Sequence, residues 1–110
     1  MAGGHAHAMI YKFKSKATGD VIMLGPNGDQ LLRLLGREPA AQGIIEPAAM
    51  PEARRLIQQA LAEADTVARE ATDDADERAR EAVGLRQRVW PMLQMLERAE
   101  AAGEAVVWGV

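Results

Sequence analysis

The sequence predicts an α+β fold, in which a small, mainly antiparallel sheet is covered on one face by about three helices. Apolar side chains first recur at period two and then at helical spacing, and the last residues are again β-branched and aromatic. The predicted strands are 9–15, 20–25, 105–109 and a very short one at 43–46, and the predicted helices are 28–36, 51–72 and 85–102. A hairpin, then helices, then a terminal strand fits this class better than a doubly wound parallel sheet.

Length and composition limit the protein to one domain. A chain of 110 residues buries enough surface to fold without metals or disulfides, and it has no cysteine, so we expect a cytoplasmic protein. No apolar run approaches the roughly 20 residues of a membrane-spanning helix. Residues 1–8 lack periodicity, so we expect a disordered leader or a tag remnant before a single domain over 9–110. His5 and His7 lie in that leader without further metal ligands, and no cofactor is expected.

Lysines line one face of the first predicted strand. Tyr11 and Phe13 alternate with Lys12 and Lys14, which predicts one buried and one solvent-facing side. The two lysines are weak candidates for binding phosphate or an acidic partner. An ordinary solvated face that also protects the strand from aggregation explains them as well.

A glycine-rich turn precedes the first predicted helix. Asn27 stands where an N-cap residue is expected, and Gly36 is expected to end the helix. Backbone N–H groups at a helix N-terminus attract anions, so Asn27 and Gly28 form a weak candidate anion site together with Lys12 and Lys14. Neither nucleotide-binding glycine motif is present, and an ordinary turn is the competing interpretation.

An acidic connector is predicted at about 72–82, after an alanine-rich helix face. Residues 63–81 hold eight acidic side chains and three arginines, so the segment carries −5 while the whole chain carries −3. Asp73, Asp74, Asp76 and Glu77 are weak candidates for partner binding, against a solvated connector that could continue as helix. A weakly basic body with an acidic segment does not indicate a nucleic-acid-binding protein.

Pro91 interrupts the last predicted helix. The apolar stripe of Leu85, Val89 and Leu96 keeps its phase across it, which favours a continuous, kinked helix over two separate helices. Trp90 and Trp108 are expected in the core, with Tyr11 and Phe13.

The residues needed for common enzyme chemistry are missing. Ser15 is the only serine and both histidines lie in the leader. Asp20, Asp29 and Glu46 are the only carboxylates near strand or helix ends that merit attention as acids or bases. We therefore expect no enzyme but an interaction or adaptor module, or alternatively a domain that binds a small ligand or anion through Asn27, Gly28 and the Lys12/Lys14 face.

Two blocks of sequence resemble a known family. Residues 9–47, with FKSKA and GPNG, and residues 84–110, ending in VVWGV, resemble the DUF1840 family of small bacterial proteins. The family has no assigned function, so the resemblance implies no catalytic residue and no cofactor. The connector departs from it, because alanine and arginine interrupt the acidic run here.

Overall fold

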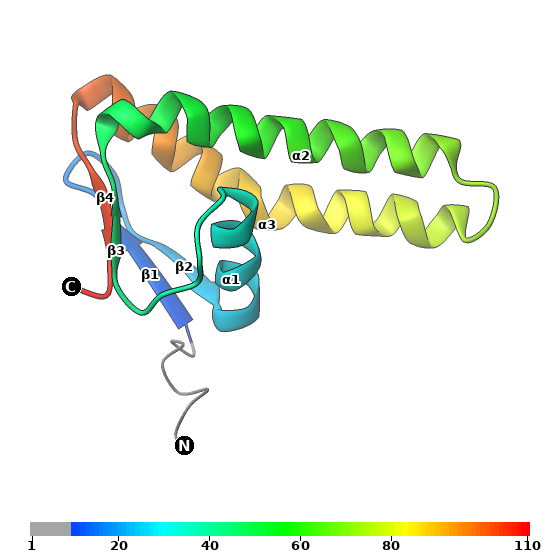
Figure 1. Ribbon diagram of the computed structural model, residues 1–110, viewed down its shortest axis with the longest axis horizontal. Coiled ribbons are helices and arrows are strands. Elements are labelled where there is room, and N and C mark those ends of the chain that lie inside the picture. The colour runs from blue at the N-terminus through cyan, green and yellow to red at the C-terminus, as the bar shows by residue number, and fades with distance from the viewer. Residues whose placement is uncertain (1–9) are drawn as a thin grey trace, which may run out of the picture.

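The structure is a computed structural model that describes residues 10–110. The predictions for residues 1–8, and for a strand start at residue 9, lie outside the described residues. Four strands and three α-helices follow one another in the order hairpin, helix, strand, two helices, strand (Figure 1). The elements are β1 Ile10–Lys14, β2 Val21–Leu24, α1 Gly25–Leu34, β3 Gly43–Ile45, the 3-10 turn η2 Pro47–Ala49, α2 Met50–Glu70, α3 Ala75–Ala102 and β4 Val106–Trp108.

The sheet has the strand order β2-β1-β4-β3, and all neighbouring strands are antiparallel. The hairpin pairs Phe13 with Val21, and on its other side Phe13 lies opposite Trp108. Trp108 in turn lies opposite Gly43, so β4 joins the hairpin to β3. The predicted α+β class and antiparallel sheet are confirmed.

Three aromatic rings cover the inner face of the sheet. Tyr11 and Phe13 stack with their ring centroids 5.7 Å apart, and Phe13 meets Trp108 edge to face at 5.4 Å. A glycine lies against each end of this row. A side chain on Gly28 of α1 would overlap the Tyr11 ring, and a side chain on Gly43 of β3 would overlap the Trp108 ring. The core forms where this row meets the helices.

All helices lie on the inner face of the sheet (Figure 1). The buried strand residues alternate with exposed ones, Lys12 and Lys14 among them, so the outer face is open to solvent. α2 and α3 run side by side as an antiparallel hairpin that extends well beyond the sheet, while α1 lies beside its base (Figure 1). One face of the hairpin is therefore covered by α1 only at the base.

The helix boundaries correct two predictions. α1 begins at Gly25 rather than at residue 28, and its N-cap is Leu24 rather than Asn27. Pro26 explains the early start, because its φ is already helical and its missing N–H needs no partner in the first turn. Gly36, at φ 79°, ends the helix as predicted.

The last helix begins ten residues before the predicted residue 85, so most of the segment at 72–82, for which the sequence left helix or loop open, is helical. The loop occupies only residues 71–74, and α3 begins at Ala75. Alanine, glutamate and arginine propagate a helix well, and Asp76 and Glu77 in the first turn interact favourably with its positive end.

α3 is one continuous helix through Pro91, as predicted. Figure 1 shows its axis changing direction between its first and second halves, as expected where a proline removes a backbone hydrogen bond. Trp108 is buried at 3% exposure, but Trp90 is 44% exposed, so its expected place in the core is wrong. Trp90 directly follows the buried Val89, and one residue turns a helix by about 100°, which carries the indole off the buried stripe.

Candidate functional site

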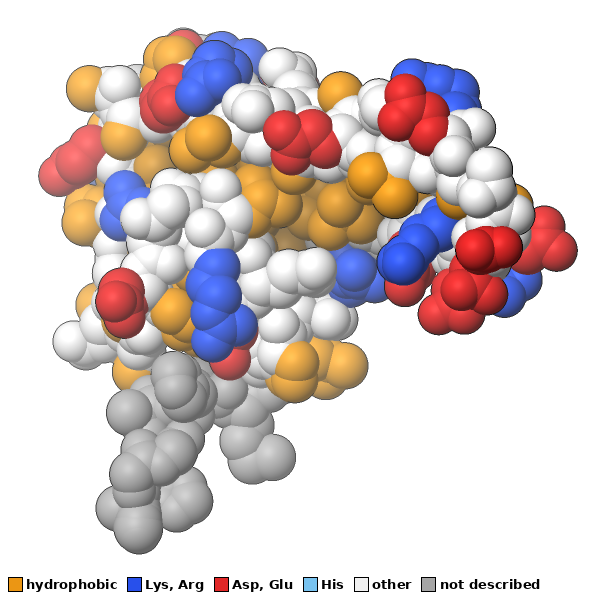
Figure 2. Space-filling view, turned by 45° about the vertical axis from the view of Figure 1, so that its right-hand side comes forward, with side chains coloured by type: hydrophobic (Ala, Val, Ile, Leu, Met, Phe, Trp, Pro, Cys, Tyr) orange, Lys and Arg blue, Asp and Glu red, His pale blue; other side chains and the backbone are white. Residues whose placement is uncertain are grey.

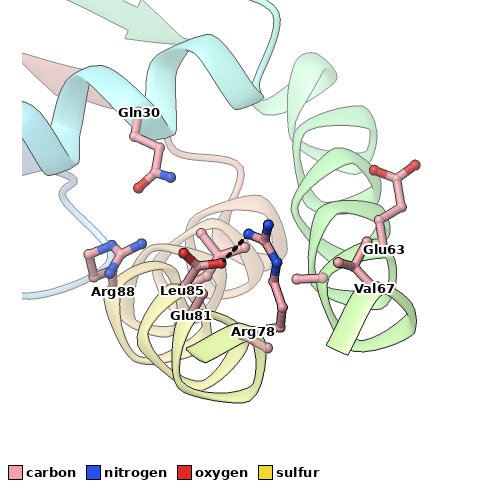
Figure 3. A pocket seen from close by; sticks show the side chains of 9 residues that line it. Gln30, Glu63, Val67, Arg78, Glu81, Leu85 and Arg88 are labelled. Atoms are coloured by element: carbon pink, nitrogen blue, oxygen red, sulfur yellow. Dashed lines mark hydrogen bonds and ion pairs between the residues drawn. The ribbon is translucent and has the colours of Figure 1, made fainter. Parts of the chain in front are cut away.

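A groove lies between the α2–α3 hairpin and α1, and it is lined by residues of all three helices. It encloses about 400 Å³, and Figure 2 shows a hollow below α2 with apolar side chains along its floor. Its lining residues come from all three helices: Gln30, Glu63, Ala64, Val67, Arg78, Glu81, Ala82, Leu85 and Arg88 (Figure 3).

The floor of the groove is apolar and only partly covered. Ala64 and Leu85 are half-buried, and Val67 is 53% exposed. The small alanines of α2 keep its backbone close to α3, so the floor is shallow. These residues belong to the apolar stripes that hold the hairpin together, but here no third helix covers them.

Most charges on the rim already have a partner. The Arg78 guanidinium contacts the Glu81 carboxylate at 3.0 Å (Figure 3), and the Gln59 amide donates to Glu63 at 3.3 Å. Both contacts are exposed, so each contributes at most about 1 kcal/mol. The first contact balances the charges of Arg78 and Glu81, while the neutral Gln59 amide leaves the charge of Glu63 in place.

Arg88 differs from the other rim residues. Its Nε is buried and, within residues 10–110, has no hydrogen-bond partner. A Cβ atom on Gly84, one turn earlier, would lie 3.2 Å from Nη1 of Arg88, so the glycine leaves room for the guanidinium to lie back along α3. Gln30 extends from α1 toward the same end of the groove (Figure 3). A buried donor without a partner costs stability, and among residues 10–110 no ion pair offsets the charge of the Arg88 guanidinium.

The acidic candidates lie elsewhere. Asp73 and Asp74 are in the 71–74 loop, and Asp76 and Glu77 are in the first turn of α3. All four are exposed at the far end of the hairpin, where Figure 2 shows acidic side chains gathered. None of them lines the groove.

The candidate anion residues are not brought together. Lys12 and Lys14 lie on the outer side of β1, beside a hollow of about 180 Å³ that Trp108 and Gly109 also line. Asn27 and Gly28 lie on α1, on the inner side of the sheet. Because α1 begins at Gly25, the Gly28 N–H lies four residues after the Leu24 carbonyl and is used inside the helix. The sheet therefore separates the two halves of the site that the sequence suggested.

Of the three carboxylates singled out as acid–base candidates, only Asp29 has a described buried partner. The Tyr11 hydroxyl donates to Asp29 Oδ1 at 2.5 Å. Burial, followed by this hydrogen bond and the negative charge of Asp29, raises the pKa of Tyr11 to about 12. Asp20 and Glu46 are exposed. Among residues 10–110, no three His, Cys, Asp or Glu side chains are grouped so that they could hold a metal ion. None of the helices described is both long and apolar enough to cross a membrane.

Comparison with known families assigns nearly all of this architecture to one unit. Residues 9–108, which hold all four strands and the whole groove, match the model of the family described as "Domain of unknown function (DUF1840)". The chain belongs to the DUF1840 family. No curated protein and no solved structure shows significant similarity to this DUF1840 chain.

Sequence reasoning missed the groove of the DUF1840 chain. Its residues come from 30, 63–67 and 78–88, and only the packing of α1 against the hairpin base brings them together. The sequence holds a partial signal, because Val67 and Leu85 lie on helix faces whose other apolar residues are mostly alanine. Side chains as small as alanine do not fully cover the larger apolar residues beside them, so this pattern indicates a partly exposed apolar face.

Proposed function

We propose that this DUF1840 protein is a non-enzymatic protein-interaction module, and that its partner docks in the groove between α1, α2 and α3. The observation that carries the proposal is the uncovered apolar floor of the groove, with Val67 53% exposed. Apolar side chains left in contact with water beside polar rims are a common feature of docking surfaces. The concave shape favours a protein segment that inserts between the helices.

Affinity purification under native conditions tests this proposal, with wild type and two variants compared side by side. Val67→Glu places a charge on the groove floor. Val83→Glu places the same charge on α3 outside the groove, at a valine that is 56% exposed and thus matched to Val67. We expect one or more specific partners to be lost with Val67→Glu and kept with Val83→Glu. Equal recovery with both variants, or no specific partner with wild type, contradicts the proposal.

The Lys12/Lys14 face supports a second candidate, a regulatory domain that binds a small anion. Both lysines line the hollow of about 180 Å³ on the outer side of β1, and neither has a described ion pair. A thermal-shift series with phosphate, nucleotides and polyanions tests it, because a bound ligand stabilises the folded state by mass action. If the domain binds an anion at this face, one of these anions raises the melting temperature of wild type, and the Lys12→Gln/Lys14→Gln variant loses this increase. If no anion stabilises the wild type, this second function is ruled out.

A further inference from the structure

We propose that the segment received by the groove is an amphipathic α-helix of a partner protein, and that a carboxylate on this helix pairs with Arg88. This inference rests on the proposed function and specifies the class of partner. It is carried by the shape of the groove, by the chemistry of its floor and by Arg88, the rim cation for which residues 10–110 provide no partner.

The shape of the groove fits a helix. α2 and α3 lie side by side, and α1 lies next to them only at the base of the hairpin (Figure 1). A helix laid along the hairpin beyond α1 completes a three-helix arrangement over the far half. The groove extends along α3 from Arg78 to Arg88, which at 1.5 Å per residue is about 15 Å, or about three helical turns.

The floor fits the apolar stripe of such a helix. Ala64, Val67 and Leu85 offer small and medium side chains, so a helix backbone can approach closely. Helices that bind in grooves insert apolar side chains at positions i, i+3 or i+4, and i+7. A stripe from i to i+7 is about 10 Å long, or about two turns, and fits within the groove.

The charged residues on the rim favour a negative charge on the partner helix. The charge of Arg78 is paired with that of Glu81, whereas Glu63 accepts only from the neutral Gln59 amide and keeps its negative charge. Arg88 is the cation left over, with a buried Nε and with Gln30 facing the same end of the groove. An incoming carboxylate would pair with the charged guanidinium of the partly exposed Arg88, while an incoming lysine would face a like charge there.

A selection from a yeast-displayed helix library tests the inference with a defined probe. Each library member is a helix of about three to four turns with a Leu/Ile/Val/Ala stripe and with flanking positions randomised among Glu, Gln and Lys. The full chain is used as bait in four forms: wild type, Arg88→Glu, Val67→Glu and Val83→Glu. Circular dichroism and thermal melting confirm that each bait is folded, and Arg88→Gln replaces Arg88→Glu if the charge reversal does not fold.

We expect wild type and Val83→Glu to enrich helices with Glu at one fixed flanking position. Arg88→Glu is expected to enrich Lys at that position, Arg88→Gln to enrich neither, and Val67→Glu to enrich no helix. Fluorescence anisotropy with the best acidic helix should show about 10- to 100-fold weaker binding to Arg88→Gln, as expected for loss of a hydrogen bond to a charged group.

Two outcomes overturn the inference in different ways. If wild type and the Arg88 variants enrich the same helices, Arg88 does not select a carboxylate, while docking in the groove stands. If wild type enriches nothing beyond the Val67→Glu background, a helix is not the occupant. The affinity purification with Val67→Glu and Val83→Glu then tests the proposed function independently of the helix library.

Discussion

A Cβ atom on Gly28 would lie 2.1 Å from Cδ2 of Tyr11, so the backbone of α1 rests directly on the tyrosine ring. This contact fixes the distance between the first helix and the central strand of the sheet. It also explains the second glycine of the GPNG segment by packing, without any bound anion.

Gly28→Ala is expected to lower the free energy of unfolding by about 1–3 kcal/mol, because the added methyl group forces α1 away from β1. Urea denaturation followed by circular dichroism measures the change. Gly19→Ala is the control, since a Cβ atom there meets no other atom within 4 Å. Equal midpoints for both variants would mean that α1 adjusts without cost.

The Tyr11–Asp29 hydrogen bond predicts a loss of stability at high pH. The pKa of Tyr11 is raised to about 12 in the folded chain, whereas an unfolded tyrosine has a pKa of about 10. The folded state therefore holds this proton more tightly. Its contribution is fully present below pH about 10 and is lost as the pH rises to about 12, by about 2–3 kcal/mol in total.

Absorbance at the phenolate band measures this titration directly, because Tyr11 is the only tyrosine in the chain. Denaturant midpoints across the same pH range give the change in stability, with Tyr11→Phe as the control that lacks the titrating hydroxyl. An ordinary tyrosine titration in the folded protein, or an equal loss of stability in Tyr11→Phe, would contradict the predicted linkage.

The two tryptophans should respond very differently to truncation. Trp108 is 3% exposed, packs against Phe13 and donates from Nε1 to the Ala40 carbonyl, so Trp108→Ala should cost about 3–5 kcal/mol. Trp90 is 44% exposed, so Trp90→Ala should cost about 1 kcal/mol or less. Denaturation of the two variants in parallel gives the comparison. A large loss with Trp90→Ala would show that the indole packs more tightly on α3 than its exposure indicates.

Asp74 has a φ of 57°, a left-handed conformation that glycine adopts freely and that aspartate and asparagine tolerate better than other residues. Asp74→Gly is thus expected to raise the free energy of unfolding by up to about 1 kcal/mol. Asp73→Gly removes the same charge at a residue without a positive φ, and it should be neutral or slightly destabilising. Thermal melting of both variants distinguishes relief of backbone strain from removal of acidic repulsion.

Local signals in the sequence predicted most of the elements correctly. Alternation around Tyr11 and Phe13 identified the first strand, and the stripe through Val89 and Leu96 identified a helix that continues past Pro91. The errors arose where two local preferences compete. Pro26 overrode Asn27 as the signal for a helix start, and the helix propensity of residues 75–82 overrode their acidic, solvated character.

The candidate site was beyond local reasoning. Gln30, Val67 and Arg88 each look unremarkable in sequence, and their proximity results from how α1 packs at the base of the α2–α3 hairpin. The exposure of Trp90, in contrast, was within reach of the sequence, because Trp90 lies one residue, or about 100°, away from the apolar stripe through Val89. Tertiary contacts between distant segments decide the groove, and helix periodicity decides the place of Trp90.

The place of β4 between β1 and β3 has a consequence for synthesis. Neither of these strands contacts the other, so a nascent chain that has released the hairpin and β3 still has no sheet linking them. Only when residues 106–108 emerge can Trp108 bridge Phe13 and Gly43. The α2–α3 hairpin, built from neighbouring segments, is free to assemble earlier, and closure of the sheet is therefore expected to be the late and slow event in the biogenesis of this protein.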